Sequence, residues 1–364
     1  MSSQQAMTVI PKVKLEYLNT IDTPPQSPQD LHRQAATNDD PTIDSWRETW
    51  IKNYKDNHTK FGPFRDSAIG KLFGELRLKP CIVAGSGPSL ANNIETLKLK
   101  GDIPLISCLH NFHYFEDHGV GVNYYVSLDA GPITIEELSE GGKNTHEFYL
   151  EKSKDKTLLA FCGSDPGLIS SWKGKVYWFN CPIPDSRVRA AHNEVERFEN
   201  FISNGGNVLG AALYIAKAYM GANPIVFVGA DFSFSGASHA LLSGIGLNKF
   251  HAWESKYDGK LGQAMRAIDC FGNKVYTWAS YFNFKCWFDS VCIRCPGEFI
   301  NCSEGGTLGV YQEGLIRHIK HKSLKEFIDG VSLFETMKFQ AENPQDANED
   351  PGIPGIAPQP KLFF

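Results

Sequence analysis

Between about Leu76 and Val310, short apolar runs alternate with segments of helical periodicity. This alternation is typical of a mainly parallel β-sheet whose strands are joined by helices. Because each connection between parallel strands must cross the sheet, helices then cover its faces. The sequence therefore predicts an α/β fold, with a helix at 207–222 that begins at the N-cap Asn207. The predicted strands are 80–85, 103–108, 123–129, 157–163, 175–180 and 224–231.

Length and charge narrow the class of protein. The chain has 364 residues, of which 42% are hydrophobic, so it can bury a large core. A formal net charge of -5 gives no general attraction to nucleic acid or to an anionic membrane. No leader pattern opens the chain, and no apolar run reaches the roughly 20 residues of a membrane span. We expect a soluble, cytoplasmic protein without a nucleic-acid partner.

The two ends differ in composition from the central region. Residues 1–41 are rich in Ser, Gln, Pro, Thr and Asp, and 341–364 are rich in Pro, Gly and acidic residues. Both read as flexible segments that can order against a protein partner or a second copy of the chain. Residues 42–75 are predicted to form a helical segment that precedes the main domain. Trp46 and Trp50 lie on one face of this helix, which is predicted to pack on that domain. Residues 311–340 read as closing helices.

Nine cysteines are scattered along the chain, and an odd number favours reduced thiols over a disulfide framework. Cys292 and Cys295 have the spacing of half a zinc knuckle. Cys286 and Cys302 lie nearby but do not form a second C-x-x-C pair. A metal site and a group of ordinary buried thiols both remain open here.

The stretch Gly85-Ser86-Gly87-Pro88-Ser89 lies between the first predicted strand and a helix. A turn of this kind presents backbone N–H groups and the positive end of a helix to an anion, usually a phosphate. It is not a P-loop, because Gly-Lys-Ser/Thr is absent. It is not a dinucleotide fingerprint either, because Leu90 replaces the third glycine. We predict a site for a nucleotide phosphate, with a purely structural turn as the competing interpretation.

Polar residues follow several predicted strands, at the edge where open α/β sheets bind ligands. Asn111 follows the second strand, and Asp129 and Asp231 each close a later one. A carboxylate there can hold Mg²⁺ together with ligand phosphates, or bind ribose hydroxyls. The alternative is that each Asp caps the next turn.

Two further segments carry candidate residues. His239 follows Asp231 in a Gly/Ser loop and can act as a general base or donate to a phosphate, or simply be exposed. Asn301, Glu304 and the pair Gly305-Gly306 can bind a polar ligand, or form a tight turn.

Four segments in this order resemble the 6-hydroxymethylpterin diphosphokinase MptE-like family, which includes the motility accessory factors. They are "GKLFGELRLKPCIVAGSGPSLANNIETLKLKGDIPLISC", "HGVGVNYYVSLDAG", "SNGGNVLGAALYIAKAYMGANPIVFVGADFSFSGASHA" and "NCSEGGTLG", and the resemblance covers about Gly70 to Val310. It implies a Rossmann-like fold and a nucleotide-dependent transferase domain over 76–310. The family's archaeal enzyme transfers diphosphate from ATP to a hydroxymethyl-dihydropterin with Mg²⁺.

The resemblance also implies a role for each matching residue. Asp129 and Asp231 become candidate Mg²⁺ ligands, and His239, Asp231 and Glu304 become candidate catalytic residues. The candidate donor-binding residues are Gly85, Ser86, Gly87, Pro88, Ser89, Asn111, Asp129, Asn301, Gly305 and Gly306.

The resemblance leaves the transferred group open. "NFHYFED", Asn111 to Asp117, is similar to a donor-binding segment of bacterial sialyltransferases, which use CMP-sugars. Residues 141–201 have no counterpart in either family and are predicted to be an insertion or the region that holds a small-molecule or glycan acceptor. Diphosphate transfer from ATP, sugar transfer from a nucleotide-sugar, and a non-catalytic assembly protein on the same scaffold all remain open.

Overall fold

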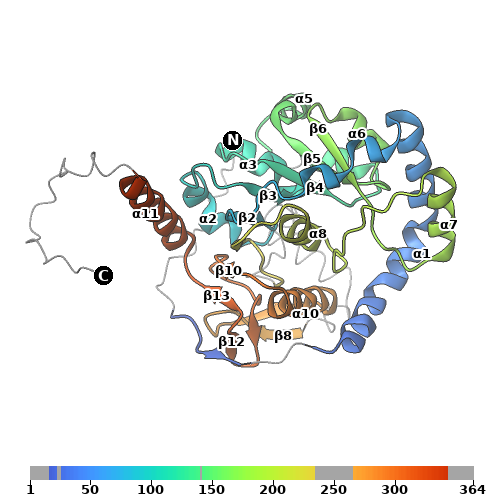
Figure 1. Cartoon of the computed structure of the whole chain (residues 1–364). Coiled ribbons are helices and arrows are strands. Elements are labelled where there is room, and N and C mark those ends of the chain that lie inside the picture. Colours follow the sequence, from blue (N-terminus) through green and yellow to red (C-terminus); the bar gives the residue numbers. More distant parts are fainter. Residues whose placement is uncertain (1–15, 23–25, 140–141, 234–264, 343–364) are drawn as a thin grey trace, which may run out of the picture. The chain divides into compact units, whose positions relative to one another are not determined.

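The computed structural model describes residues 16–22, 26–139, 142–233 and 265–342. The chain forms two compact units, Met1–Leu324 and Lys325–Phe364. The described part of the second unit belongs to helix α11 (Leu324–Glu342) (Figure 1). Within these ranges, no helix combines the length and apolar character that a membrane crossing requires.

The first unit is built on an eight-stranded sheet in which every pair of neighbouring strands is parallel. The order across the sheet is β13-β10-β7-β2-β3-β4-β5-β6, and helices surround it (Figure 1). This confirms the predicted α/β, Rossmann-like fold, and the six predicted strands are β2 to β7. The strands are β2 (Cys81–Ala84), β3 (Leu105–Cys108), β4 (Tyr124–Ser127), β5 (Thr157–Phe161), β6 (Lys175–Phe179), β7 (Ile225–Val228), β10 (Phe299–Asn301) and β13 (Ile319–His321).

The order of the strands creates a switch point between β2 and β7. From β2 the chain moves through β3 to β6 in one direction, and then returns to place β7, β10 and β13 on the other side of β2. The connections that leave β2 and β7 therefore run to opposite sides, although the first residues of the two loops pack against each other. The connecting helices are α2 (Leu90–Leu97), α3 (Phe112–His118), α4 (Ile133–Glu137), α5 (His146–Lys152), α6 (Pro166–Ser171), α7 (Ser186–Val195), α8 (Val208–Tyr214) and α10 (Ala279–Arg294).

The central strands are apolar because they are covered on both faces. All four residues of β2, β3, β4 and β7 are buried. Side chains of these strands, such as Val83 and Phe227, share one core with Ala211 and Ala212 of α8. Small residues on α8 allow the helix to lie close to the sheet, which places the helix start at the carboxyl edge of the strands.

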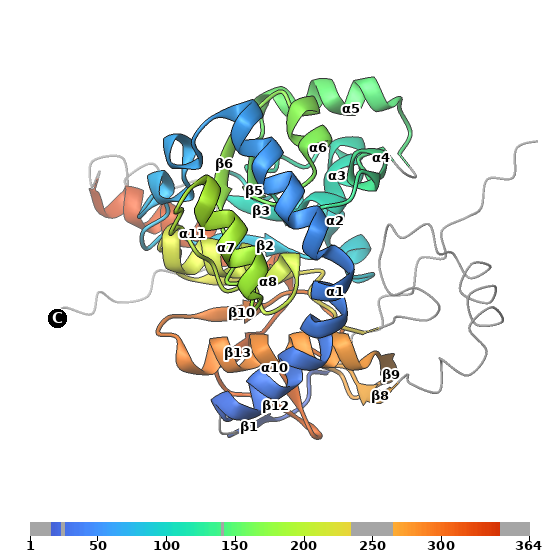
Figure 2. The ribbon, with the colours of Figure 1, turned by 90° about the vertical axis from the view of Figure 1, so that its right-hand side faces the viewer.

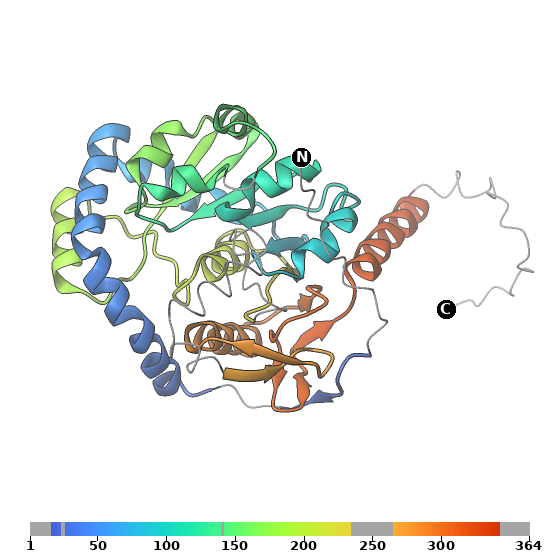
Figure 3. The ribbon, with the colours of Figure 1, turned by 180° about the vertical axis from the view of Figure 1, so that it is seen from behind.

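The predicted flexible arm over 1–41 is wrong in its last part, because helix α1 (Pro28–Phe61) already begins at Pro28. Ser27 accepts a hydrogen bond from the Asp30 N–H at 3.1 Å, and proline is favoured at the first helical position. Strand β1 (Thr20–Ile21) also belongs to the fold, since it pairs with β12 (Gly314–Ile316). Residues 1–15 lie outside the described residues. Figures 2 and 3 show α1 as a long diagonal helix running from α10 to α7.

The predicted helices over 311–340 are wrong up to residue 323. Strands β11 (Val310–Tyr311), β12 and β13 occupy this segment, and α11 begins at Leu324. Gln312 has a φ of 52°, which closes the β11–β12 hairpin, and β13 pairs with β10 along the sheet. The hairpin β8 (Met265–Ile268)–β9 (Lys274–Thr277) was also not predicted. Most of the predicted tail, 343–364, lies outside the described residues.

The prediction that 141–201 is an insertion is wrong as well. This stretch supplies β5 and β6, two full members of the sheet, with α5, α6 and α7 between and after them. The hydrophobic pattern correctly predicts strands at 157–163 and 175–180. Only the interpretation of 141–201 as an insertion, which came from the family resemblance, is wrong.

A buried carboxylate fixes the end of α1. Glu196 follows α7, and its side chain is 1% exposed. It accepts from the Phe64 N–H at 2.8 Å and from the Arg65 Nε at 2.9 Å, and His58 Nε2 lies 3.3 Å away. Tyr54 of α1 also stacks on His192 of α7, with ring centroids 3.8 Å apart. These contacts join α1 to α7.

We expect Glu196→Ala to lower the free energy of unfolding by about 1–3 kcal/mol, because it leaves the buried Phe64 N–H without an acceptor and removes the ion pair with Arg65. Urea denaturation measures the loss. Glu194→Ala, at an exposed carboxylate on α7, is the control and should change stability little. Equal effects of the two substitutions would contradict a specific anchoring role.

Candidate functional site

The glycine loop Gly85–Ser89 packs tightly against the loop that follows β7. A Cβ on Gly85 would lie 2.4 Å from the Gly229 oxygen, and one on Gly87 would lie 2.6 Å from the Asp231 Cγ. The Gly87 N–H donates to the Gly229 oxygen at 2.8 Å, and the Gly85 N–H donates to Val228 at 2.9 Å. Both glycines are therefore required by the contact between the two loops at the switch point.

The Asp231 side chain adds two hydrogen bonds between these loops. Its carboxylate accepts from the Ser89 N–H at 2.8 Å, and the Ser89 hydroxyl donates to its other oxygen. The side chain is buried, and burial raises the pKa of Asp231 to about 6, although the hydrogen bonds from Ser89 oppose the shift. The glycine loop thus holds an anion of the protein itself. A phosphate bound to the Ser89 N–H would have to displace Asp231.

The turn around Gly305 and Gly306 completes this centre. Gly306 has a φ of 75°, and a Cβ there would lie 2.4 Å from the Asp231 Cα. The Thr307 N–H donates to the Asp231 backbone oxygen at 2.7 Å, while Asn301 donates to Leu308 at 3.2 Å. The Glu304 carboxylate points elsewhere and accepts from the Leu324 N–H at 3.3 Å. The structure brings together Gly85–Ser89, Asp231 and Asn301–Gly306. That they bind a ligand stays a prediction.

Asn111 supports the glycine loop from the β3 side. Its side-chain amide donates to the Gly85 oxygen and to the Ser107 hydroxyl, each at 3.0 Å. The residue is fully buried, and its Oδ1 has no hydrogen-bond partner in the described part of the chain. Asn111 is therefore placed at the predicted edge with one acceptor unused.

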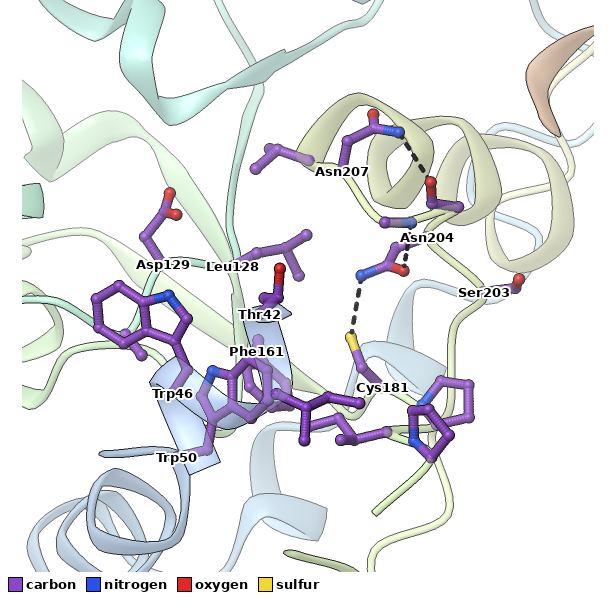
Figure 4. Close-up of a pocket in the computed structure, with 18 of the residues that line it drawn as sticks. Thr42, Trp46, Trp50, Leu128, Asp129, Phe161, Cys181, Ser203, Asn204 and Asn207 are labelled. Carbon is purple, nitrogen blue, oxygen red and sulfur yellow. Dashed lines mark hydrogen bonds between the residues drawn. The ribbon is translucent and has the colours of Figure 1, made fainter. Parts of the chain in front are cut away.

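Asp129 lies elsewhere, on a cavity of about 520 Å³ at the carboxyl ends of β4, β5 and β6 (Figure 4). Figure 4 shows Trp46 and Trp50 on one side of this cavity, and Asn204 and Asn207 on the other. The lining residues are Thr42, Ile43, Trp46, Trp50, Leu128, Asp129, Ala130, Phe161, Cys181, Pro182, Ile183, Pro184, Ser203, Asn204, Gly205, Gly206, Asn207, Val208, Phe284 and Trp287.

The polar wall of the cavity is the turn that leads into α8. Asn207 caps the helix by accepting from the Gly210 N–H at 2.9 Å, as predicted. Asn204 accepts from the Gly206 N–H at 3.0 Å and donates toward the Cys181 sulfur at 3.7 Å. Gly205 has a φ of 57°, which favours glycine at this tight turn. The segment "SNGGN" is therefore shaped to present this helix start to the cavity.

Among the described residues, Asp129 is the only Asp or Glu that lines the cavity, and no described Lys, Arg or His lines it. In the described structure no side chain forms a hydrogen bond or ion pair with its carboxylate. Asp129 is exposed, since its carboxylate opens to solvent through the cavity, and desolvation by the surrounding protein raises its pKa. A carboxylate without a protein partner is available to bind a cation.

The described residues contain no group of three His, Cys, Asp or Glu side chains that could hold a metal ion. Within those ranges, no such group contains Asp129 and Asp231, and none contains Cys286, Cys292, Cys295 and Cys302. Burial raises the pKa of Cys286 to about 11 and that of Cys292 higher still, which keeps these thiols protonated. His239 lies outside the described residues.

The sequence analysis did not identify the aromatic residues that line this cavity as candidate functional residues. Trp46 and Trp50 were interpreted only as a packing stripe, and Trp287 and Phe284 of α10 carried no signal at all. These side chains come from opposite ends of the chain, so only the folded structure brings them to one cavity. The "SNGGN" segment carried a signal through its resemblance to the family.

The raised pKa of Asp231 gives stability a defined dependence on pH. The folded protein keeps this carboxyl protonated up to about pH 6, whereas an ordinary Asp releases its proton near 3.8. Between these values the folded state binds more protons than the unfolded chain, so the free energy of unfolding falls as the pH rises.

Asp231→Asn removes this titration. We expect the fall between pH about 4 and about 6 to become smaller by at most about 3 kcal/mol, while the lost acceptor for Ser89 adds an offset that does not depend on pH. Urea denaturation across this range measures both. Asp66→Asn, at an exposed carboxylate, is the control. Parallel curves for wild type and Asp231→Asn would contradict the shifted pKa.

A solved structure and a family model match the chain. The Maf glycosyltransferase from Magnetospirillum magneticum AMB-1 is a similar solved structure, with 16% identity and a TM-score of 0.49. The match covers 72% of this chain and 38% of that one, so this chain spans well under half of its length. No curated protein sequence matches the chain. A family model matches residues 48–237, a little over half of the sequence, and the chain therefore belongs to the 6-hydroxymethylpterin diphosphokinase MptE-like family.

Proposed function

We propose that the protein is a nucleotide-dependent transferase that works at the cavity beside Asp129. Family membership supplies a transferase-like scaffold. The observation that carries the proposal is the unpaired Asp129 carboxylate, which opens on an aromatic cavity at the carboxyl edge of the sheet. Open α/β sheets bind their ligands at this edge, and a perturbed carboxyl group in a cavity is a candidate functional group.

Asp129 is our candidate for the protein ligand of Mg²⁺. Both oxygens of Asp231 already accept hydrogen bonds from Ser89, so Asp231 is the weaker candidate. One carboxylate suffices when donor phosphates and water complete the coordination of Mg²⁺. Bound there, Mg²⁺ would neutralise charge on the donor phosphates, which is the main need in phosphoryl transfer.

The protein's own groups would position the two reactants. The helix start at Asn207 and Val208 lies on the cavity and favours negative charge, so donor phosphates fit on this side. The glycine loop Gly85–Ser89 becomes a second phosphate contact only if Asp231 moves. His239 remains our candidate for activating the acceptor hydroxyl, whereas Glu304 accepts from the Leu324 N–H and does not line this cavity. The proposed acceptor is a small molecule or a glycan.

Sugar transfer from a nucleotide-sugar is the second candidate. Tryptophan side chains that face a carboxylate suit a sugar ring, because the ring packs its apolar face on the indole while the carboxylate accepts from its hydroxyls. Trp46, Trp50 and Trp287 line the cavity with Asp129 in this way. Diphosphate transfer and sugar transfer then differ in the donor and not in the scaffold.

We expect Asp129→Asn to weaken Mg²⁺-dependent nucleotide binding about tenfold or more, because it removes the charged ligand while keeping the shape of the side chain. Isothermal titration calorimetry with and without Mg²⁺ measures the effect. Asp102→Asn, at an exposed carboxylate, is the control and should bind as the wild type does. Unchanged Mg²⁺ dependence in Asp129→Asn would remove Asp129 from the metal site.

A panel of ATP, GTP, CMP, CMP-sialic acid and UDP-sugars separates the candidates. Binding of ATP that requires Mg²⁺ would support diphosphate transfer, whereas selective binding of CMP or a nucleotide-sugar would support sugar transfer. If the folded protein binds none of these ligands, the result would favour a non-catalytic assembly protein.

A further inference from the structure

One face of α1 carries four residues that meet the cavity and its supporting loops. Trp46, Trp50, Asn53 and Asn57 follow one another at intervals of four, three and four residues, which is the spacing of a single helical face. Trp46 and Trp50 line the cavity, and Trp46 is 37% exposed there. Asn53 and Asn57 are buried, at 4% and 0% exposure.

The two asparagines attach this helix to the loops after β4 and β5. The Asn53 amide donates to the Ala130 oxygen at 2.9 Å and to the Gly163 oxygen at 3.1 Å. The Asn57 amide donates to the oxygens of Cys162 and Ser164, each at 2.9 Å. Each side chain therefore uses both of its N–H donors on backbone carbonyls, and each would leave buried acceptors unpaired if it were lost.

These loops are the ones that carry Asp129. Ala130, whose backbone oxygen accepts from Asn53, directly follows Asp129 in the chain. The backbone oxygen of Asp129 accepts from the Asp165 N–H at 3.1 Å. Asp165 in turn caps α6 by accepting from the Leu168 N–H at 2.8 Å. The position of the tryptophans relative to the carboxylate is therefore set by hydrogen bonds between α1 and the two loops.

The charge of the cavity lining limits which ligand groups can bind against Trp46 and Trp50. Among the described residues, the lining contains no Lys, Arg or His, and Asp129 is its one carboxylate. A phosphate placed against Trp46 and Trp50 would face a carboxylate without a compensating cationic side chain. An uncharged ring has no such cost, and it gains contact with the indole faces.

We propose that the Trp46–Trp50 face of α1 is the subsite for an uncharged ring of the ligand, and that Asn53 and Asn57 are positioning residues that set its distance from Asp129. The ring belongs either to the nucleobase of the donor or to a sugar, and both sources share a flat apolar face with polar edges. This inference rests on the proposed function, since it assigns a part of the same cavity.

The positioning role is tested without a ligand. The full chain is labelled with 5-fluorotryptophan, and the ¹⁹F resonances of Trp46 and Trp50 are assigned from Trp46→Phe and Trp50→Phe. We expect Asn53→Asp and Asn57→Asp, which keep the side-chain shape but lose the donors, to shift these two resonances. Asn93→Asp is the matched control, because Asn93 is a buried helix residue that donates to Cys302 and Ser303 at another site.

The expected change is specific to these two tryptophans, and Asn93→Asp should leave their resonances in place even if it lowers stability by a similar amount. A single variant that fails to fold does not decide the matter, because Asn53 and Asn57 are tested separately. Unmoved Trp46 and Trp50 resonances in a folded Asn53→Asp or Asn57→Asp would overturn the positioning role.

The ring subsite is tested by titrating the labelled protein with uncharged nucleosides and, separately, with methyl pyranosides at millimolar concentrations. A shift of the Trp46 and Trp50 resonances by nucleosides assigns the site to the nucleobase, and a shift by pyranosides assigns it to a sugar. Trp50→Ala should weaken that binding about tenfold. No response to either series, or binding unchanged in Trp50→Ala, would overturn the subsite.

The same samples separate this inference from the proposed function. Calorimetry with Mg²⁺ and nucleotides reports on the donor, whereas the ¹⁹F resonances report on the ring. If nucleotides bind in an Asp129-dependent way but the tryptophan resonances do not shift, the ring subsite is wrong and the transferase proposal is kept. If an uncharged ring shifts the tryptophan resonances but no nucleotide binds under any condition, the transferase proposal is wrong and the ring subsite is kept.

Discussion

The hydrogen bonds between Asp231 and Ser89 join the loop after β2 to the loop after β7, at the point where the strand order changes direction. Gly85 and Gly87 lack side chains because the Gly229 backbone and the Asp231 side chain occupy that space, and Gly306 packs on the Asp231 backbone. Three glycine-rich segments that are distant in sequence therefore meet around one buried carboxylate.

The sheet was most predictable where strands are buried on both faces, since every residue of β2, β3, β4 and β7 is buried. The edge strand β6 was predicted from its apolar residues after Lys175, although it is only partly buried. The strands β10 and β13 were not predicted, because three residues each are too few to show a period. The helical start at Pro28 was missed for a different reason. Polar composition was taken as a sign of a flexible arm, whereas the Ser27 cap and Pro28 at the first position are local signals of a helix start.

The candidate site was predictable in its parts but not in its arrangement. Residues that follow parallel strands must lie at one edge, which correctly placed Asn111, Asp129 and Asp231 there. The sequence could not show that Asp231 turns inward to Ser89 while Asp129 opens on a cavity. Nor could it show that Trp46 from α1 and Trp287 from α10 wall that cavity, since no local pattern links residues so far apart in the chain.

The two carboxylates have different surroundings. The pKa of Asp231 is raised by burial, but its carboxylate keeps two hydrogen bonds from Ser89, so a group of the protein itself already occupies the Ser89 donors of the glycine loop. The pKa of Asp129 is raised by desolvation, and its carboxylate opens to solvent without a described side chain as partner. A carboxylate without a protein partner gains more from a bound cation than one whose oxygens already accept hydrogen bonds. This contrast supports our proposal that the ligand binds at the tryptophan-lined cavity rather than at the glycine loop.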